Sequence, residues 1–145
     1  MSINNTYHGQ VIWSQVDANM HLRHSAYADF AAQARIALLD ILGLEFKVFQ
    51  KLRIGPILFR EELQYKREVG MNDKIKITTM LTKSKPDGSR WSIKHELFRN
   101  DGTLAAIINV DGAWMDVMQR KLTKLPEDLA LEFMKLPKSE DYVEM

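Results

Sequence analysis

The chain has 145 residues, of which 46% are hydrophobic and 27% charged, so one globular domain spanning residues 1–145 is expected and intrinsic disorder is excluded. Its 20 Lys and Arg residues nearly balance its 19 Asp and Glu residues, which disfavours nucleic acid as a partner. The absence of cysteine excludes disulfides, thiolate nucleophiles and Cys-ligated zinc, and it fits the reducing cytoplasm. The N-terminus lacks a signal-peptide pattern, and the apolar run at residues 36–44 is too short to cross a membrane. We therefore expect a cytoplasmic protein without a membrane partner.

The first half of the chain predicts a strand and then a long helix. Alternation predicts a strand from Tyr7 to Gln15, with Val11 and Trp13 on one face. Between Ser25 and Leu42, apolar side chains recur every three or four residues, as in an amphipathic helix. This segment is rich in alanine, which lets a sheet approach closely, and Gly43 suits a helix C-terminus.

The second half predicts mostly strands. Apolar alternation indicates strands at residues 57–69, 74–83, 91–97 and 103–118. The turn sequences Lys85–Gly88 and Asn100–Gly102 separate the last three, which should form antiparallel hairpins, and Pro126 suits the first turn of a short C-terminal helix. One long helix against a strongly curved antiparallel sheet is an α+β fold.

The densest polar cluster lies just before the long helix, in residues 11–27. A helix N-terminus offers unpaired N–H groups and the positive end of the helix dipole, which can hold an oxyanion. The carboxylate of Asp17 lies a few residues upstream. A base or nucleophile beside an oxyanion site is what acyl transfer requires.

The same segment carries a family resemblance. Trp13, Asp17, His21, Tyr27 and the pair Ala34–Arg35 fall in step with the pattern W-x-D-x-D-x-x-G-H-V-N-N-x-x-Y and the helical A-R that follows it. The segment 112–127 also resembles the last strand and the P-E-D/E helix start of that family. The chain thus resembles the hotdog-fold acyl-CoA thioesterases of the 4-hydroxybenzoyl-CoA thioesterase kind. The resemblance implies a long central helix wrapped by a five- to six-stranded antiparallel sheet, assembled as a homodimer or homotetramer.

The resemblance also implies roles for individual residues. Asp17 would be the catalytic carboxylate, as nucleophile or as general base for water. The backbone N–H of His24 would polarise the thioester carbonyl. Asn19, His21 and Tyr27 would contact the substrate, an acyl- or aroyl-CoA, and no cofactor or metal is required.

Several positions depart from the family pattern. Gln15 replaces the first Asp, Met20 the Gly before His21, and Arg23 with His24 the Asn pair. Ala32 stands where many members carry a helical Glu, so the predicted chemistry rests on Asp17.

Each candidate residue also has an alternative interpretation. Asp17 could simply bond the amides of its own loop, or bind a metal with His21 and His24, whose H-x-x-H spacing allows this. Strand alternation places Glu61 on an apolar face with Ile57, Phe59, Leu63 and Tyr65. There it could be a second catalytic carboxylate or the partner of Arg35 or His24, or a β-bulge could turn it out to solvent.

Further positions are assigned on weaker signals. The basic side chains Lys83, Lys85, Arg90 and Arg99 could contact coenzyme A phosphates or form a solvated rim, and Arg90 is our candidate. Trp91, Trp114 and Phe59 are predicted in the core rather than as side chains that stack on substrate. Asn109 and Asp111 mark either a subunit contact or an exposed strand end, and we favour the strand end.

Two other functions remain open at this point. A hotdog domain could bind an acyl or aryl ligand without turnover, and the departures at Gln15, Met20 and Ala32 favour this somewhat. It could also be a hotdog dehydratase or hydratase, but the His–carboxylate motif that such enzymes need is not found.

Overall fold

A computed structural model describes residues 3–145. The first two residues of the N-terminal segment, where we expect no signal peptide, lie outside the described residues. The elements in chain order are β1 (Thr6–Gln10), a short 3-10 helix (Trp13–Gln15), α1 (Ala26–Ile41), α2 (Phe46–Leu52), β2 (Ile54–Tyr65), β3 (Lys74–Ser84), β4 (Arg90–Arg99), β5 (Leu104–Asp116), β6 (Lys121–Thr123), α3 (Glu127–Phe133) and β7 (Lys138–Glu144). The predicted α+β class is confirmed.

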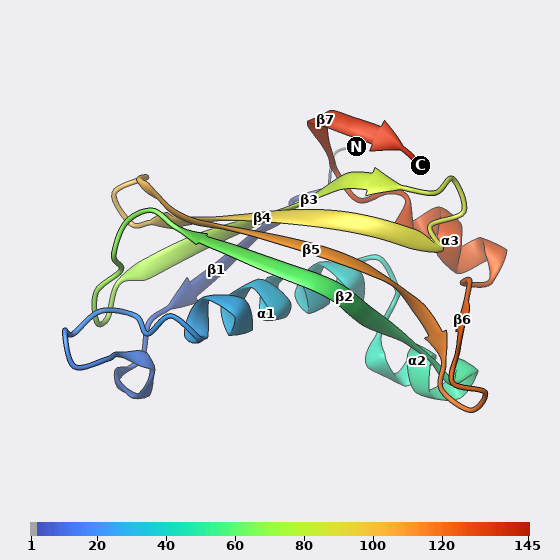
Figure 1. Ribbon diagram of the computed structural model, residues 1–145, viewed down its shortest axis with the longest axis horizontal. Coiled ribbons are helices and arrows are strands. Elements are labelled where there is room, and N and C mark those ends of the chain that lie inside the picture. Colours follow the sequence, from blue (N-terminus) through green and yellow to red (C-terminus); the bar gives the residue numbers. More distant parts are fainter. Residues whose placement is uncertain (1–2) are drawn as a thin grey trace.

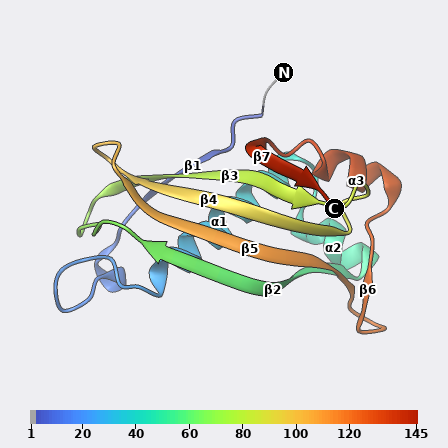
Figure 2. The ribbon, with the colours of Figure 1, turned by 45° about the horizontal axis from the view of Figure 1, so that its top comes forward.

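The strands form one sheet with the order β1-β3-β4-β5-β2, to which β6 adds at β5 and β7 at β3. This makes seven strands in residues 3–145, against the expected five or six. All neighbours are antiparallel except β7, which pairs in parallel with β3 beyond the segment paired with β1. The strand β2 lies at the free margin of the sheet (Figure 2).

Helix α1 crosses one face of the sheet, as the periodicity predicts (Figure 1). Its buried side includes Ala31 and Ala34, which are 0% and 2% exposed, because small side chains allow close approach to the strands. The helix ends where Gly43 adopts a φ of +86°, a left-handed conformation that glycine accommodates without steric cost. We call the helix-covered face of the sheet the inner face and the opposite one the outer face.

Trp91 and Trp114 lie in the core as predicted, 3% and 0% exposed. The ring of Trp114 packs edge-on against Phe133 of α3, at 5.4 Å between centroids. Gly112 makes room for the Trp91 ring, since a Cβ at position 112 would clash with that ring and with the Ile57 carbonyl. Phe59, however, is 52% exposed, so its predicted core position is wrong.

The predicted strand from Tyr7 to Gln15 is also wrong in its second half. The N–H of Ile12 donates to Oε1 of Gln15 at 2.9 Å, and this contact accompanies the 3-10 turn that ends strand pairing after Gln10. Val11 is therefore buried, whereas Trp13 is 77% exposed.

No helix within residues 3–145 has the length and apolar character needed to span a membrane.

Candidate active site

Asp17 organises the loop that precedes α1. Its Oδ1 atom accepts hydrogen bonds from the N–H groups of Asn19 at 2.9 Å and His21 at 3.2 Å. The backbone closes the same loop, with the N–H of Asp17 donating to the His21 carbonyl at 2.8 Å. The alternative in which Asp17 bonds its own loop is thus realised, but by one oxygen only. Oδ2 has no hydrogen-bond partner in residues 3–145, so this oxygen remains available for chemistry.

The loop is fastened beside the start of α1. Val16 and Leu22 form an antiparallel bridge, and the N–H of Arg23 donates to the Gln15 carbonyl at 2.8 Å. The Arg23 guanidinium also donates to the hydroxyl of Ser25 at 3.0 Å and to the carbonyl of Ser14. Arg23, which replaces a family Asn, therefore clamps the loop to the helix start.

His24 lies two residues before α1. Its N–H donates to no acceptor in the described part of the chain, whereas its carbonyl accepts the hydroxyl of Tyr65 at 3.1 Å. A free N–H next to the positive end of a 16-residue helix is a suitable donor for an oxyanion. The imidazole itself is exposed.

Tyr27 lies in the first turn of α1, 4% exposed, with its ring edge-on to that of Tyr65 at 5.1 Å between centroids. Burial raises its pKa above the usual value, and the neighbouring Tyr65, Asp17 and Glu68 raise it further. The phenol therefore stays protonated at neutral pH. The effect of Asp17 on Tyr27 also shows that these two predicted site residues lie near one another.

The other predicted substrate contacts, Asn19 and His21, are exposed on the loop surface. His21 also bridges to Gly70, which ties the loop to the segment between β2 and β3. Met20, between them, has a φ of +63°, a left-handed conformation that explains why the family pattern has Gly there.

Glu61 lies elsewhere, in the middle of β2. Simple alternation predicts that Glu61 shares a face with both Ile57 and Leu63. A bulge between Leu58 and Arg60 shifts the strand register, so Glu61 shares the inner face with Leu63, whereas Ile57 lies on the outer face. Glu61 is exposed and makes no ion pair with Arg35 or His24 within residues 3–145. Burial lowers the pKa of Arg35, and the negative charge of Glu61 offsets only part of this effect. Glu61 is thus not part of the Asp17 loop.

A buried polar cluster next to Glu61 was missed from the sequence. Nη1 of Arg35 on α1 donates to Nε2 of His95 on β4 at 2.9 Å, so the imidazole proton must sit on Nδ1, 3.0 Å from the hydroxyl of Thr79. His95 is 0% exposed. Burial, aided by the charge of Arg35, lowers its pKa to about 3. The signal that could have found it is a His on an alternating apolar strand opposite the family Arg.

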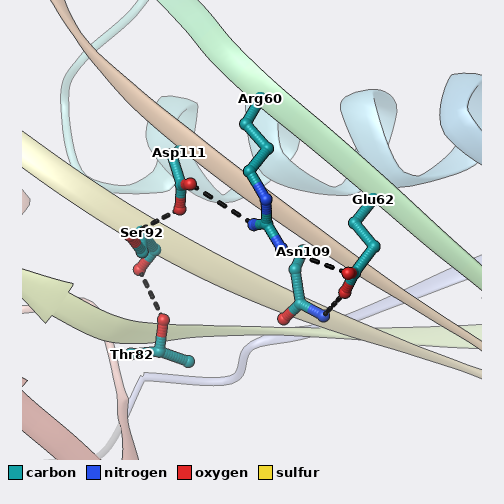
Figure 3. A network of polar contacts seen from close by, with 6 residues as sticks. All are labelled: Arg60, Glu62, Thr82, Ser92, Asn109 and Asp111. Carbon is teal, nitrogen blue, oxygen red and sulfur yellow. Dashed lines mark hydrogen bonds and ion pairs between the residues drawn. The ribbon is translucent and has the colours of Figure 1, made fainter.

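Arg90 lies at the opposite end of the sheet from the Asp17 loop, where β4 begins (Figure 1). Within one chain it is therefore not brought to Asp17. Asn109 and Asp111 were predicted at an exposed strand end, and this is wrong. They lie within β5 on the outer face, half-buried in a polar network (Figure 3).

In residues 3–145 no three His, Asp or Glu side chains are arranged to hold a metal ion, so the geometry gives no support to a site of Asp17, His21 and His24.

Comparison with known proteins places this geometry in a family. The model of the thioesterase-like superfamily matches residues 11–133. No curated protein matches the sequence significantly. A hypothetical protein from Staphylococcus aureus, solved in complex with CoA, is 19% identical, with a TM-score of 0.87 over 96% of this chain and 89% of that one.

Two other similar structures are enzymes. The DHNA-CoA thioesterase of Staphylococcus aureus is 20% identical, with a TM-score of 0.82 over 90% of this chain and 88% of that one. A gentisyl-coenzyme A thioesterase is 20% identical, with a TM-score of 0.78 over 88% and 98%. At these identities the structures establish the hotdog fold, and the match over residues 11–133 establishes the family. The chain therefore belongs to the thioesterase-like superfamily and has the hotdog fold of these structures.

Proposed function

We propose that the protein hydrolyses the thioester of an acyl- or aroyl-CoA at the start of α1. One observation carries this proposal. The same short segment holds a carboxylate oxygen, Oδ2 of Asp17, and a backbone N–H, that of His24, which both lack partners within the described chain. The carboxylate oxygen can attack or act as a base while the backbone N–H binds the oxyanion.

In the proposed reaction the N–H of His24 donates to the thioester carbonyl oxygen. Asp17 either attacks the carbonyl carbon or removes a proton from an attacking water. In the first case an acyl–Asp17 anhydride forms, the thiolate leaves and takes up a proton, and water then releases the acid. In the second case hydroxide adds directly and the thiol leaves. Asn19, His21 and Tyr27 border the reacting groups, and Glu61 is a less favoured alternative carboxylate.

Support for coenzyme A as the carrier comes from relatives. One similar structure contains CoA, and two others are named for CoA thioesters that they hydrolyse. A cytoplasmic location, where acyl-CoA is found, fits the absence of cysteine in the chain.

We also propose that the protein is at least a homodimer paired through β2. This marginal strand carries large exposed apolar side chains, Leu58, Phe59 and Tyr65, at 40%, 52% and 52% exposure. An unpaired strand edge of this kind is a template for a second strand. A two-fold antiparallel pairing would bring the Ile54 end of one β2 towards the Tyr65 end of the other. Sedimentation should therefore give at least twice 16.8 kDa at micromolar concentration, and a monomer would refute this assembly.

The activity is tested by a panel of short, long and aromatic acyl-CoA thioesters, read out by release of free thiol. Turnover of at least one member is expected. Binding of the panel without thiol release would support the ligand-binding alternative. A change in enoyl absorbance without thiol release would instead support a dehydratase or hydratase.

A further inference from the structure

We propose that Tyr65 is a positioning residue for the hydrolysis: its hydroxyl holds the backbone of His24 so that the His24 N–H faces the thioester carbonyl. The inference rests on the proposed function, in which this N–H is the oxyanion donor. Tyr65 acts through His24 and does not itself react. It comes from the end of β2, 41 positions further along the chain.

The direction of the His24 N–H is set first by the peptide group between Arg23 and His24. The carbonyl of this group, that of Arg23, accepts the N–H of Ala26 at 3.0 Å. Because the peptide is planar and trans, its C=O and N–H point in opposite directions. The bond to Ala26 therefore turns the His24 N–H away from α1, and the backbone alone fixes this side of the residue.

The peptide group on the other side of His24 is held by a side chain. Its carbonyl, that of His24, accepts the Tyr65 hydroxyl at 3.1 Å, which is the only side-chain hydrogen bond to the His24 backbone in residues 3–145. Helix α1 begins two residues later, at Ala26, so His24 lies outside its regular hydrogen-bonded turns. Without the hydroxyl, the backbone of His24 would be restrained on one side only.

Tyr65 is itself held by the sheet and by the helix. It is the last residue of β2, and the next two N–H groups, those of Lys66 and Arg67, both donate to the Ala105 carbonyl, at 2.8 and 3.0 Å. Its ring packs edge-on against Tyr27 in the first turn of α1, at 5.1 Å between centroids. The hydroxyl is thus carried by ordered elements on both sides, as the support of a preorganised site requires.

The proposed pairing of β2 with a second copy leaves this contact intact. Pairing would use the backbone groups of β2 and cover the Tyr65 ring, which is 52% exposed. The bond from the Tyr65 hydroxyl to His24 lies within one chain. The positioning role therefore requires neither a free Tyr65 surface nor a contact across the interface.

Holding the donor matters most in the transition state, where the carbonyl oxygen gains negative charge. Removing an oxyanion donor altogether lowers kcat by about 10²–10³-fold. In Tyr65→Phe the N–H remains but is less firmly oriented, so we expect a smaller loss of kcat, about tenfold. KM should change by less than about twofold, because the ground-state carbonyl makes the weaker hydrogen bond.

Steady-state thiol release from Tyr65→Phe tests this, since phenylalanine keeps the ring and its packing on Tyr27. The matched control is Tyr142→Phe. The Tyr142 hydroxyl also makes one side-chain hydrogen bond, with that of Ser84 at 2.7 Å, but at the far end of β3. This control should keep the wild-type kcat. A wild-type kcat in Tyr65→Phe, or equal losses in the two variants, would overturn the positioning role.

Sedimentation separates positioning from assembly. Tyr65→Phe should sediment like wild type, because the apolar ring on β2 is retained. A smaller species accompanying the loss of kcat would assign that loss to assembly and would overturn the positioning role.

A measurement without substrate follows the His24 backbone directly. The ¹⁵N relaxation of the His24 amide should give an order parameter near ~0.85 in wild type and in Tyr142→Phe, and a clearly lower one in Tyr65→Phe. An unchanged order parameter in Tyr65→Phe would show that the hydroxyl does not hold His24. If wild type hydrolyses no thioester, the proposed function fails, while the order parameter still decides whether Tyr65 fixes this backbone. If wild type is active and Tyr65→Phe matches it in both measurements, only the positioning role fails.

Discussion

Two groups of polar side chains are associated with α1: the Asp17 loop before the helix, and the cluster in which Arg35 of the helix meets His95. They differ in exposure and in the sequence separation of the residues they join. The Asp17 loop is exposed, and the side-chain hydrogen bonds of Asp17 join residues two and four positions apart. The cluster of Arg35, His95 and Thr79 is buried, and its Arg35–His95 contact joins residues 60 positions apart. The first is organised by local backbone geometry and the second by the packing of helix against sheet.

The difference separates reactivity from architecture. In the loop, one carboxylate oxygen and one N–H are left without partners in the described chain, so they can serve a substrate. In the buried cluster both ring nitrogens of His95 are engaged, and the ring is kept neutral. A neutral, fully bonded imidazole cannot take up a proton at neutral pH. We therefore expect changes in the loop to alter turnover and changes in the cluster to alter stability.

The largest expected effect is that of Asp17→Asn. The amide oxygen can still accept the N–H groups of Asn19 and His21, so the loop should keep its shape. The negative charge and basicity are lost, and turnover should fall by at least ~10²-fold with little change in KM. Steady-state thiol release measures this.

His24→Ala serves as the control for Asp17→Asn. Because the proposed donor at position 24 is the main-chain N–H, which alanine keeps, the His24→Ala variant should lose less activity than Asp17→Asn. A fully active Asp17→Asn protein would reject the mechanism and make Glu61 the next carboxylate to test.

The same comparison explains what the sequence could and could not predict. The helix over residues 25–42 and the predicted strands of the second half follow short-range periodicity, and the Asp17 loop is a short local motif beside that helix. All of them were recognisable. The buried cluster depends on α1 lying across β4, which is a property of the assembled fold. The sequence shows a His on an alternating apolar strand and an Arg on the helix, but it does not show that Arg35 meets His95.

Errors in the prediction have similar physical causes. The bulge in β2 exchanges the sheet faces of the residues before it. Simple alternation ignores the bulge and therefore predicts Phe59 in the core, although its side chain lies at the surface. Helix α2 has only seven residues and one buried side chain, Phe49, so its periodic signal is weak. Strand β7 contributes mostly exposed residues to the sheet and shows no clear alternation.

The next effect concerns pH and the buried cluster. Unfolded His95 binds a proton below about 6.5, whereas folded His95 does so only below about 3. Between these values the unfolded state binds more protons, so the free energy of unfolding should fall as the pH drops. From pH 6.5 to 5 the loss should be about 1.6 kcal/mol.

The comparison protein for this pH effect is His95→Gln, which keeps a hydrogen-bonding amide but cannot titrate. Denaturant unfolding of both proteins across this range isolates His95, since all other ionisable groups are shared. Parallel curves for the two proteins would show that His95 is not held neutral by the fold.

A smaller effect tests the packing around the same helix face. Ala34 is 2% exposed, so Ala34→Leu should overpack the helix–sheet contact and destabilise the fold by about 1–3 kcal/mol. Gln33→Leu introduces the same side chain on the exposed side of α1 and should change stability far less. Thermal unfolding of both variants gives the result. An unchanged midpoint for Ala34→Leu would mean that this side of α1 does not pack tightly.

The smallest effect returns to the loop. Met20 adopts a φ of +63°, which disfavours any side chain with a Cβ, and it is 51% exposed, so its side chain contributes little packing. Met20→Gly and Met20→Ala both remove that side chain, but only glycine relieves the backbone strain. The glycine variant should therefore be more stable than the alanine variant by about 1 kcal/mol. Denaturant unfolding of the pair tests this without reference to activity. Equal stabilities would show that the left-handed turn is not a requirement at this position, and the loop would then owe its shape to the hydrogen bonds of Asp17 alone.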